Sequence, residues 1–112
     1  MKVVQSDLFE NLPPEKKDRV IFNPPFWDKA RDPQNPLTYA SCDEGRNVLK
    51  KFLATVPDFL SHTDSRVVMV FSTQDNFSQV ERIITTAKGL TVKNTTTETV
   101  GHKRVLFSLG RD

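Results

Sequence analysis

The segment Val20-Ile21-Phe22-Asn23-Pro24-Pro25-Phe26 is the most informative part of this chain. Three apolar residues, typical of a short buried strand, lead into a polar amide, two prolines and an aromatic ring. Each proline fixes its own φ at about −65° and keeps the preceding residue out of the helical region, so Asn23 is held in one extended pose. Asparagine offers a carbonyl acceptor and an NH₂ donor, and Phe26 adds a flat face. This set suits a planar substrate with an amino or amide nitrogen, which would bond to the Asn23 side-chain oxygen and the Pro24 backbone carbonyl.

The same segment resembles motif IV, the (D/N)PP(Y/F/W) signature of class I S-adenosylmethionine-dependent methyltransferases that act on exocyclic or amide nitrogens. The relatives are adenine DNA methylases, guanine rRNA methylases and HemK-type glutamine methylases. Residues 3–9 resemble the end of the family's third strand, and residues 45–60 resemble the helix after motif IV. The sequence of residues 45–60 is most similar to that of the archaeal and eukaryotic HemK-like subgroup. The resemblance spans nearly the whole chain, but only the carboxy-terminal part of the family's domain.

The resemblance implies a role for each matching residue. The catalytic residues would be Asn23, Pro24, Pro25 and Phe26, which orient the acceptor nitrogen toward the sulfonium methyl and supply no general base. Cofactor contacts would come from Asp7, Leu8 and Asn23, with Asp7 bonding the adenine amino group. The substrate would contact Asn23, Pro24, Phe26 and Trp27. For three of these residues a simpler role is open: Asp7 as a solvated strand end, Leu8 as core, and Trp27 as a shield for an exposed strand edge.

The family's main cofactor motif is not present in this sequence. That motif is a glycine-rich turn after the first strand, followed by an acidic residue that ends the second strand. The chain has four glycines, and none is close enough to another to form a G-x-G turn: Gly45, Gly89, Gly101 and Gly110. We therefore expect S-adenosylmethionine to bind only if a companion chain or a second copy supplies or replaces this half.

Composition sets wide limits on the class of protein. The chain has 112 residues, a formal net charge of +2 and one cysteine, Cys42, which fits a single soluble domain in a reducing cytoplasm. No apolar run approaches the roughly 20 residues of a membrane span, so we expect no membrane contact. The histidines, His62 and His102, lack ligand spacing, and we expect no metal site. The basic pairs at 50–51 and 103–104 are more typical of solvated faces than of a nucleic-acid site.

The periodicity of the chain predicts a single partial α/β domain with a Rossmann-like sheet of about five strands and two main helices. Strands are expected at residues 2–5, 19–22, 66–71, 90–93 and 104–109. The unbroken apolar run at 66–71 predicts a strand covered on both faces. Residues 1–40 would hold the first strands, the motif and a proline-rich loop from Pro24 to Ala40, and residues 41–112 would follow as helix, strand, helix, strand, strand.

Capping signals predict where the two helices begin and end. Ser41 with Glu44, and Asn76 with Gln79, match capping boxes. Pro57 should thin or kink the last turn of the first helix, and Gly89 is the expected C-cap of the second.

The resemblance also implies a spatial strand order of 3-2-1-4-5-7-6, in which this chain supplies strands three to seven. Without strands one and two, the strand at 19–22 would be an exposed apolar edge. A longer parent enzyme, a partner chain or second copy, or antiparallel pairing with residues 2–5 would each cover it. Two main functions follow. One is a truncated or partner-dependent N-methyltransferase acting on protein glutamine or a nucleic-acid base. The other is a non-catalytic α/β protein that self-associates through this edge. A nucleic-acid-binding module is a third, weaker possibility.

Overall fold

The computed structural model describes residues 8–12, 15–25, 27, 29–30, 32–38, 42–73 and 76–112. Several sequence predictions lie outside the described residues: the strand at 2–5, the adenine contact Asp7, the aromatic Phe26 and the first capping residue Ser41.

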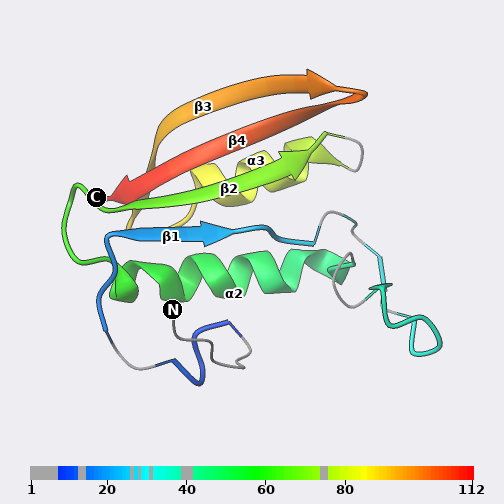
Figure 1. The fold of residues 1–112 in the computed structure, drawn as a ribbon, viewed down its shortest axis with the longest axis horizontal. Coiled ribbons are helices and arrows are strands. Elements are labelled where there is room, and N and C mark those ends of the chain that lie inside the picture. The colour runs from blue at the N-terminus through cyan, green and yellow to red at the C-terminus, as the bar shows by residue number, and fades with distance from the viewer. Residues whose placement is uncertain are drawn as a thin grey trace.

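A mixed sheet forms the centre of the fold, and in the described residues it has four strands (Figure 1). They are β1 (Arg19–Phe22), β2 (Arg66–Ser72), β3 (Leu90–Val100) and β4 (His102–Arg111). The spatial order is β1-β2-β4-β3. β1 and β2 are parallel, whereas β4 runs antiparallel to both β2 and β3. The predicted α/β class is confirmed, and these strands lie in the order that the resemblance implied for them.

The last two strands are longer than predicted. The strand predicted at residues 90–93 continues through the threonine-rich stretch after Lys93 as β3, which pairs with β4 from Leu90 to Val100. A register shift between Val92 and Asn94 interrupts this ladder once. The prediction failed because residues 94–99 are all exposed and therefore carry no apolar signal, although threonine favours strands.

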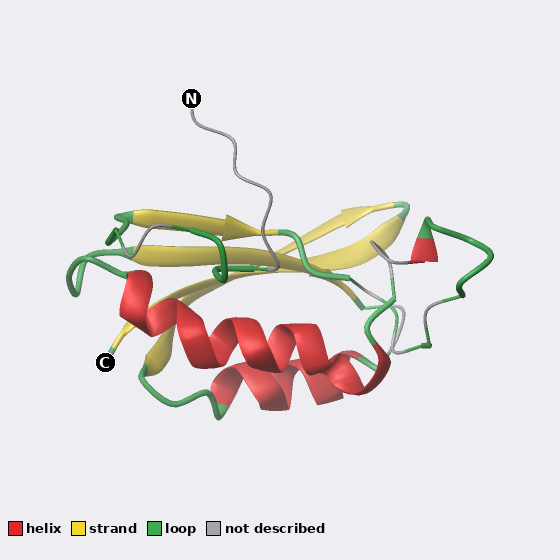
Figure 2. Ribbon diagram, turned by 90° about the horizontal axis from the view of Figure 1, so that it is seen from below, coloured by secondary structure: helices red, strands yellow, loops and turns green. Residues whose placement is uncertain are grey.

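Two helices cover one face of the sheet (Figure 2). α2 (Asn47–Thr55) follows a single 3₁₀ turn, η1 (Glu44–Arg46), and continues into a second, η2 (Val56–Phe59). The change to 3₁₀ geometry occurs beside Pro57, as predicted. α3 (Phe77–Thr85) connects β2 to β3. Among the described residues, no helix combines the length and apolar character needed to cross a membrane.

The helix caps differ from those predicted. Asn76 is the N-cap of α3, but its side chain makes no capping hydrogen bond and instead contacts the Gln79 side chain, at 3.5 Å. Gly89 is not the C-cap, because α3 ends at Thr85 with Thr86 as its cap. Gly89 has a φ of +81° and lies in the turn that leads into β3, a conformation that suits glycine.

The hydrophobic core is a single layer between the sheet and the helices. Strand residues alternate, so every second side chain points toward the helices. The buried residues of the core are Leu49, Phe52, Leu53, Val56, Leu60, Val67, Met69, Phe71, Val80, Ile84, Leu90, Val105, Phe107 and Leu109. Aromatic rings tie the layers together: Phe22 of β1 stacks on Phe52 of α2, with 4.1 Å between ring centroids. Phe9 of the segment 8–12 also stacks on Phe52, at 5.6 Å.

The opposite face of the sheet is not covered by any described element. β2 alternates between half-exposed and buried residues, so Val68 and Val70 are half-exposed whereas Met69 is buried. The prediction that this strand is covered on both faces is therefore wrong for the described part of the chain. Leu106 of β4 pairs with Val70 and is 36% exposed. Ile21 of β1 pairs with Val68 and is 82% exposed. We call Ile21, Val68, Val70 and Leu106 the open-face cluster.

Candidate functional site

The candidate site lies where β1 ends. β1 and β2 are parallel, so their carboxyl ends meet at the same edge of the sheet. Asn23 follows the last residue of β1 and is exposed, while Pro24 behind it is buried and Pro25 is half-buried. In open α/β sheets, ligands bind at the carboxyl ends of parallel strands. The structure therefore places the polar side chain of Asn23 at such an edge, directly before the buried residue Pro24.

The Asn23 side chain makes no hydrogen bond with another described residue. Both its amide oxygen and its NH₂ group therefore keep their bonding capacity for a ligand. The preceding strand holds its backbone through the ladder to β2, which pairs Phe22 with Met69. A rigid backbone with an unengaged polar tip is the arrangement that a binding residue needs.

The proline-rich loop after the motif is closed at its base. Trp27 forms an isolated parallel bridge with Cys42, and the Asp43 N–H donates to the Trp27 carbonyl oxygen over 2.7 Å. The Cys42 N–H donates to the Thr38 carbonyl oxygen over 2.8 Å. These contacts bring the two ends of the loop together, so the loop begins and ends at the same point of the fold. Cys42 is buried.

Asp43 fixes this loop base to the first helix. Its side chain is 3% exposed, and its carboxylate accepts the N–H groups of Val48 and Leu49, at 2.9 and 3.2 Å. Asp43 is the N-cap of η1 and Arg46 is the N-cap of α2, but the Asp43 carboxylate accepts the N–H groups of the first turn of α2, the task that the sequence assigned to Ser41. Sequence reasoning missed Asp43 because Ser41 lies only two residues before it, and aspartate caps as well as serine does. The consequence is a continuous hydrogen-bonded path from Trp27 to the start of α2.

A buried arginine links the starts of the two helices. Arg46 is 1% exposed and has a φ of +58°, in the left-handed region. Its Nε donates to the Gln79 side-chain oxygen of α3, at 3.3 Å. Burying a guanidinium is costly unless its donors are bonded, so this contact holds α2 and α3 in a defined relation at the same end of the sheet as Asn23. The sequence showed Arg46 only as part of a family-like helix, with no sign of its burial.

The loop carries its own compact turn, which protrudes from the fold (Figure 1). The Asp32 carboxylate accepts the Gln34 N–H at 2.9 Å, and the Asn35 side-chain oxygen accepts the Leu37 N–H at 3.2 Å. The Thr38 hydroxyl donates to the Asn35 carbonyl oxygen at 2.8 Å. Leu37 is 78% exposed in this turn. The described part of the loop is therefore held together by its own hydrogen bonds.

The aromatic residue Trp27 keeps both of its predicted roles open. It is half-buried, and the Lys29 ammonium lies 5.2 Å from its ring centroid. A cation over an aromatic face stabilises the ring position. This contact fits a platform beside Asn23 and also fits a shield for the edge of β1.

The remaining predicted residues are divided between the core and the surface. Leu8 packs against the hydrophobic core, which agrees with its simpler interpretation. His62 lies 3.1 Å from the Asp18 carboxylate, and both are exposed. The pKa of Asp18 lies below its usual 3.8, mainly because its carboxylate accepts a hydrogen bond from the Ser61 hydroxyl. Desolvation partly opposes this shift, and the charge of His62 adds to it. This cluster lies before β1, at the opposite end of the strand from Asn23.

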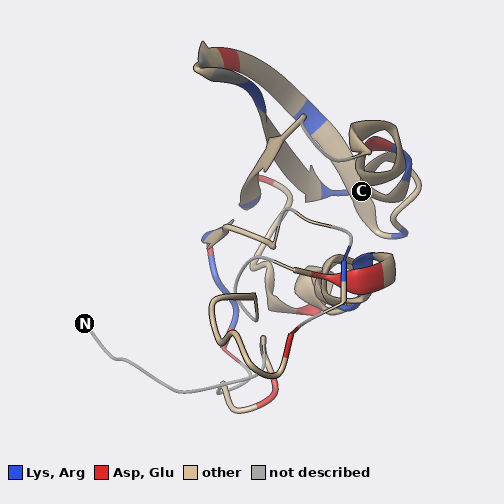
Figure 3. Cartoon of the chain, turned by 90° about the vertical axis from the view of Figure 1, so that its right-hand side faces the viewer, with Lys and Arg blue, Asp and Glu red and all other residues tan. Residues whose placement is uncertain are grey.

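Charges around the site are mixed in sign. Figure 3, which views the molecule from the side of the site, shows acidic and basic segments interspersed over the described chain. A nucleic-acid surface usually gathers its basic residues on one face. The described residues show no such stripe at this end. No model of a known protein family matches this chain.

Proposed function

We propose that this chain is the acceptor-side part of an S-adenosylmethionine-dependent N-methyltransferase, and that it works together with a companion that supplies the cofactor side. The observation that carries the proposal is the position of Asn23-Pro24-Pro25 at the carboxyl end of β1, in a sheet of order β1-β2-β4-β3. The (D/N)PP(Y/F/W) resemblance implies both this position and this order. Strand order is independent of the motif, so the agreement of the two supports a common origin.

Asn23 and Pro24 would hold the acceptor nitrogen. An N–H of the substrate would donate to the Asn23 side-chain oxygen and a second N–H to the Pro24 carbonyl oxygen. S-adenosylmethionine would supply a methyl group on a positively charged sulfur. An amide or exocyclic nitrogen is a weak nucleophile, so the gain must come from orienting its lone pair and excluding water. The buried Pro24 ring and the β1–β2 ladder suit that task, because they limit how far the two acceptors can move.

The open-face cluster supports the need for a companion. Ile21, Val68, Val70 and Leu106 form an apolar patch on the face that the helices leave bare. β1 is also the last described strand on its side of the sheet. A chain segment carrying the glycine-rich half would cover both features. Large exposed apolar patches mark interaction sites in folded proteins.

The acceptor is proposed to be a glutamine side chain in a protein. The HemK-like sequence of residues 45–60 favours a protein glutamine as the acceptor. The interspersed charges of Figure 3 give no support for a polyanionic substrate. A nucleic-acid base amino group is the competing acceptor, and binding that weakens steeply with salt would favour it.

Transfer of a radiolabelled methyl group tests the proposal. The purified chain is mixed with the glycine-rich half of a related methyltransferase, labelled S-adenosylmethionine and either a glutamine-containing peptide or an oligonucleotide. We expect label in the peptide. Asn23→Ala should lower the transfer rate about a hundredfold, because orientation is lost. Asn94→Ala, which removes an exposed amide on β3, is the matched control and should leave the rate unchanged.

Calorimetric titration with S-adenosylmethionine, with and without the companion, separates the possible failures. Micromolar binding only in the mixture supports the two-part enzyme. Folded samples that neither bind the cofactor nor transfer methyl groups, with any such half, would contradict the proposal. An unchanged rate in Asn23→Ala would contradict the assigned role of the motif.

A second candidate function is a non-catalytic protein that self-associates through β1. The supporting observation is Ile21, which is 82% exposed on an edge strand of the described sheet. This candidate predicts a dimer by sedimentation velocity that ignores S-adenosylmethionine and dissociates in Ile21→Lys, because a lysine on an edge strand disfavours pairing. A folded monomer would exclude it.

A further inference from the structure

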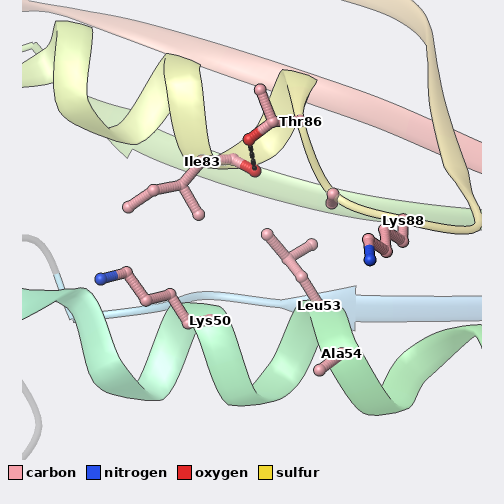
Figure 4. Close-up of a pocket in the computed structure, with 7 residues that line it drawn as sticks. Lys50, Leu53, Ala54, Ile83, Thr86 and Lys88 are labelled. Atoms are coloured by element: carbon pink, nitrogen blue, oxygen red, sulfur yellow. Dashed lines mark hydrogen bonds between the residues drawn. The ribbon is translucent and has the colours of Figure 1, made fainter.

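A groove separates the two helices on the face of the molecule away from the open-face cluster. Figure 4 shows it between α2 and the end of α3. Its volume is about 440 Å³, and it is lined by Lys50, Leu53, Ala54, Ile83, Thr86, Ala87 and Lys88. None of these residues belongs to the candidate site at the end of β1.

The floor of the groove is apolar. Leu53 and Ile83 point into the space between the helices in Figure 4. Leu53 is 3% exposed and Ile83 is half-buried, so both form part of the protein body and present a fixed surface. Ala54 and Ala87 lack longer side chains that could fill the space. The Thr86 hydroxyl donates to the Arg82 carbonyl oxygen of its own helix over 2.7 Å, so it does not close the groove.

The ends of the groove are positively charged. In Figure 4, Lys50 of α2 and Lys88, in the turn that follows α3, lie at opposite ends. Both are exposed, and neither forms an ion pair with a described residue. The neighbouring Lys51 differs, because its ammonium lies 2.6 Å from the Glu10 carboxylate. Among the residues that the structure describes, no acidic side chain lines the groove. An apolar floor between two unneutralised lysines complements a ligand that is apolar in the middle and negative at both ends.

We infer that this groove binds an acidic amphipathic helix of a partner protein. A helix presents an apolar stripe with charged residues along its borders, which matches the floor and the two lysines. Two roughly side-by-side helices also offer the ridges and grooves into which a third helix packs. A small molecule fits less well, because ligand pockets enclose most of their ligand, whereas this groove is open to solvent. The inference does not depend on the proposed methyl transfer.

The test uses the whole chain and a synthetic probe peptide. The peptide has about 18 residues, or about five helical turns, with a leucine and alanine stripe flanked by glutamates. A second peptide carries lysine in place of every glutamate. Amide shifts of the ¹⁵N-labelled chain are followed during titration. We expect the acidic peptide to shift the signals of Leu53, Ile83 and Ala87, and the basic peptide to leave them unchanged.

Matched variants assign the binding to the groove. Lys50→Glu and Lys88→Glu should each weaken the acidic peptide about five- to tenfold, since an attraction becomes a repulsion. Ala54→Glu places an acid at the floor in an exposed helical position and should weaken binding similarly without unfolding the chain. Lys103→Glu makes the same charge change on an exposed position of β4 and should have no effect.

Three outcomes would overturn the inference. The first is equal binding of both peptides. The second is a loss in Lys103→Glu as large as that in Lys50→Glu. The third is stronger binding, at the same signals, of a DNA duplex or of anionic vesicles than of the acidic peptide, because that would assign the lysines to phosphate groups.

Discussion

At the residue scale, Asp18 links acid stability to a small polar cluster. The Ser61 hydroxyl donates to its carboxylate over 2.5 Å, and this bond is the main cause of the lowered pKa of Asp18. A carboxyl whose pKa is lower in the folded state stabilises the fold above the unfolded value, here 3.8, and loses that contribution as the pH falls through the folded pKa. Asp18 therefore favours the folded state at neutral pH and progressively less in acid.

Ser61→Ala tests this link. The variant should have a pKa for Asp18 closer to 3.8, so its stability should fall less than that of the wild type between neutral pH and pH values below 3.8. Urea unfolding at several pH values measures the difference, and the titration of the other carboxylates is common to both proteins. In an Asp18→Asn background, Ser61→Ala should not change the pH dependence. A dependence that persists there would assign the effect to another group.

The residue scale also shows where sequence reasoning stops. The sequence identifies Asn23-Pro24-Pro25 and places them at a strand end, because backbone restriction and residue type are local properties. It does not reveal that Arg46 is buried and bonded to Gln79, since these residues are 33 positions apart. A contact at that separation depends on how the helices pack, and no local pattern encodes it.

At the element scale, the start of α2 depends on Asp43. Asp43→Ala should lower the free energy of unfolding by about 1–2 kcal/mol, because two amide N–H groups lose their acceptor in a buried place. Asp43→Asn should cost less, since an amide oxygen can still accept. Urea denaturation provides the measurement.

Glu44→Ala is the control for that experiment. Glu44 is exposed and was the second residue of the predicted capping box. Its removal should change the free energy of unfolding by no more than about 0.5 kcal/mol, the usual range for surface positions. A larger loss in Glu44→Ala than in Asp43→Ala would restore the predicted box.

Helices and strands whose residues follow an apolar pattern could be predicted from the sequence. Strand segments that lack such a pattern could not be predicted. β1 was predicted with its bounds, and the buried residues of α2 at Leu49, Phe52 and Leu53 follow the helical spacing of the sequence. β3 was underestimated, since its exposed threonines obtain their structure from hydrogen bonds to β4 rather than from burial. Backbone hydrogen bonds between strands do not produce a recognisable pattern of residue types in the sequence.

At the scale of the whole molecule, the helices cover one face of the sheet, and no described element covers the other. Leu106 and Phe107 are neighbours on β4 but point to opposite faces, and they are 36% and 2% exposed. Phe107→Ala should cost about 3–5 kcal/mol of stability, as a cavity would form beneath the helices. Leu106→Thr should cost no more than about 0.5 kcal/mol, because its side chain has no described layer above it.

The same pair separates folding from association. Leu106→Thr should keep the chain folded, raise its solubility and weaken its binding to the companion half. Thermal unfolding, static light scattering and a binding titration together measure these changes. If Leu106→Thr destabilises the isolated chain as strongly as Phe107→Ala does, the open-face cluster is covered within the chain itself.

The closed base of the loop after Trp27 has a consequence for how such a protein can change. The Trp27–Cys42 bridge and the Asp43–Trp27 hydrogen bond join the segment after β1 to the segment before α2, so these contacts hold the base of the loop together without the residues between Trp27 and Cys42. Those residues form an exchangeable cassette: insertions, deletions or a new sequence can enter there while the strand and the helix keep their register. Under the proposed function, recognition of different methyl acceptors would diversify at this one position, under selection separate from that acting on the core.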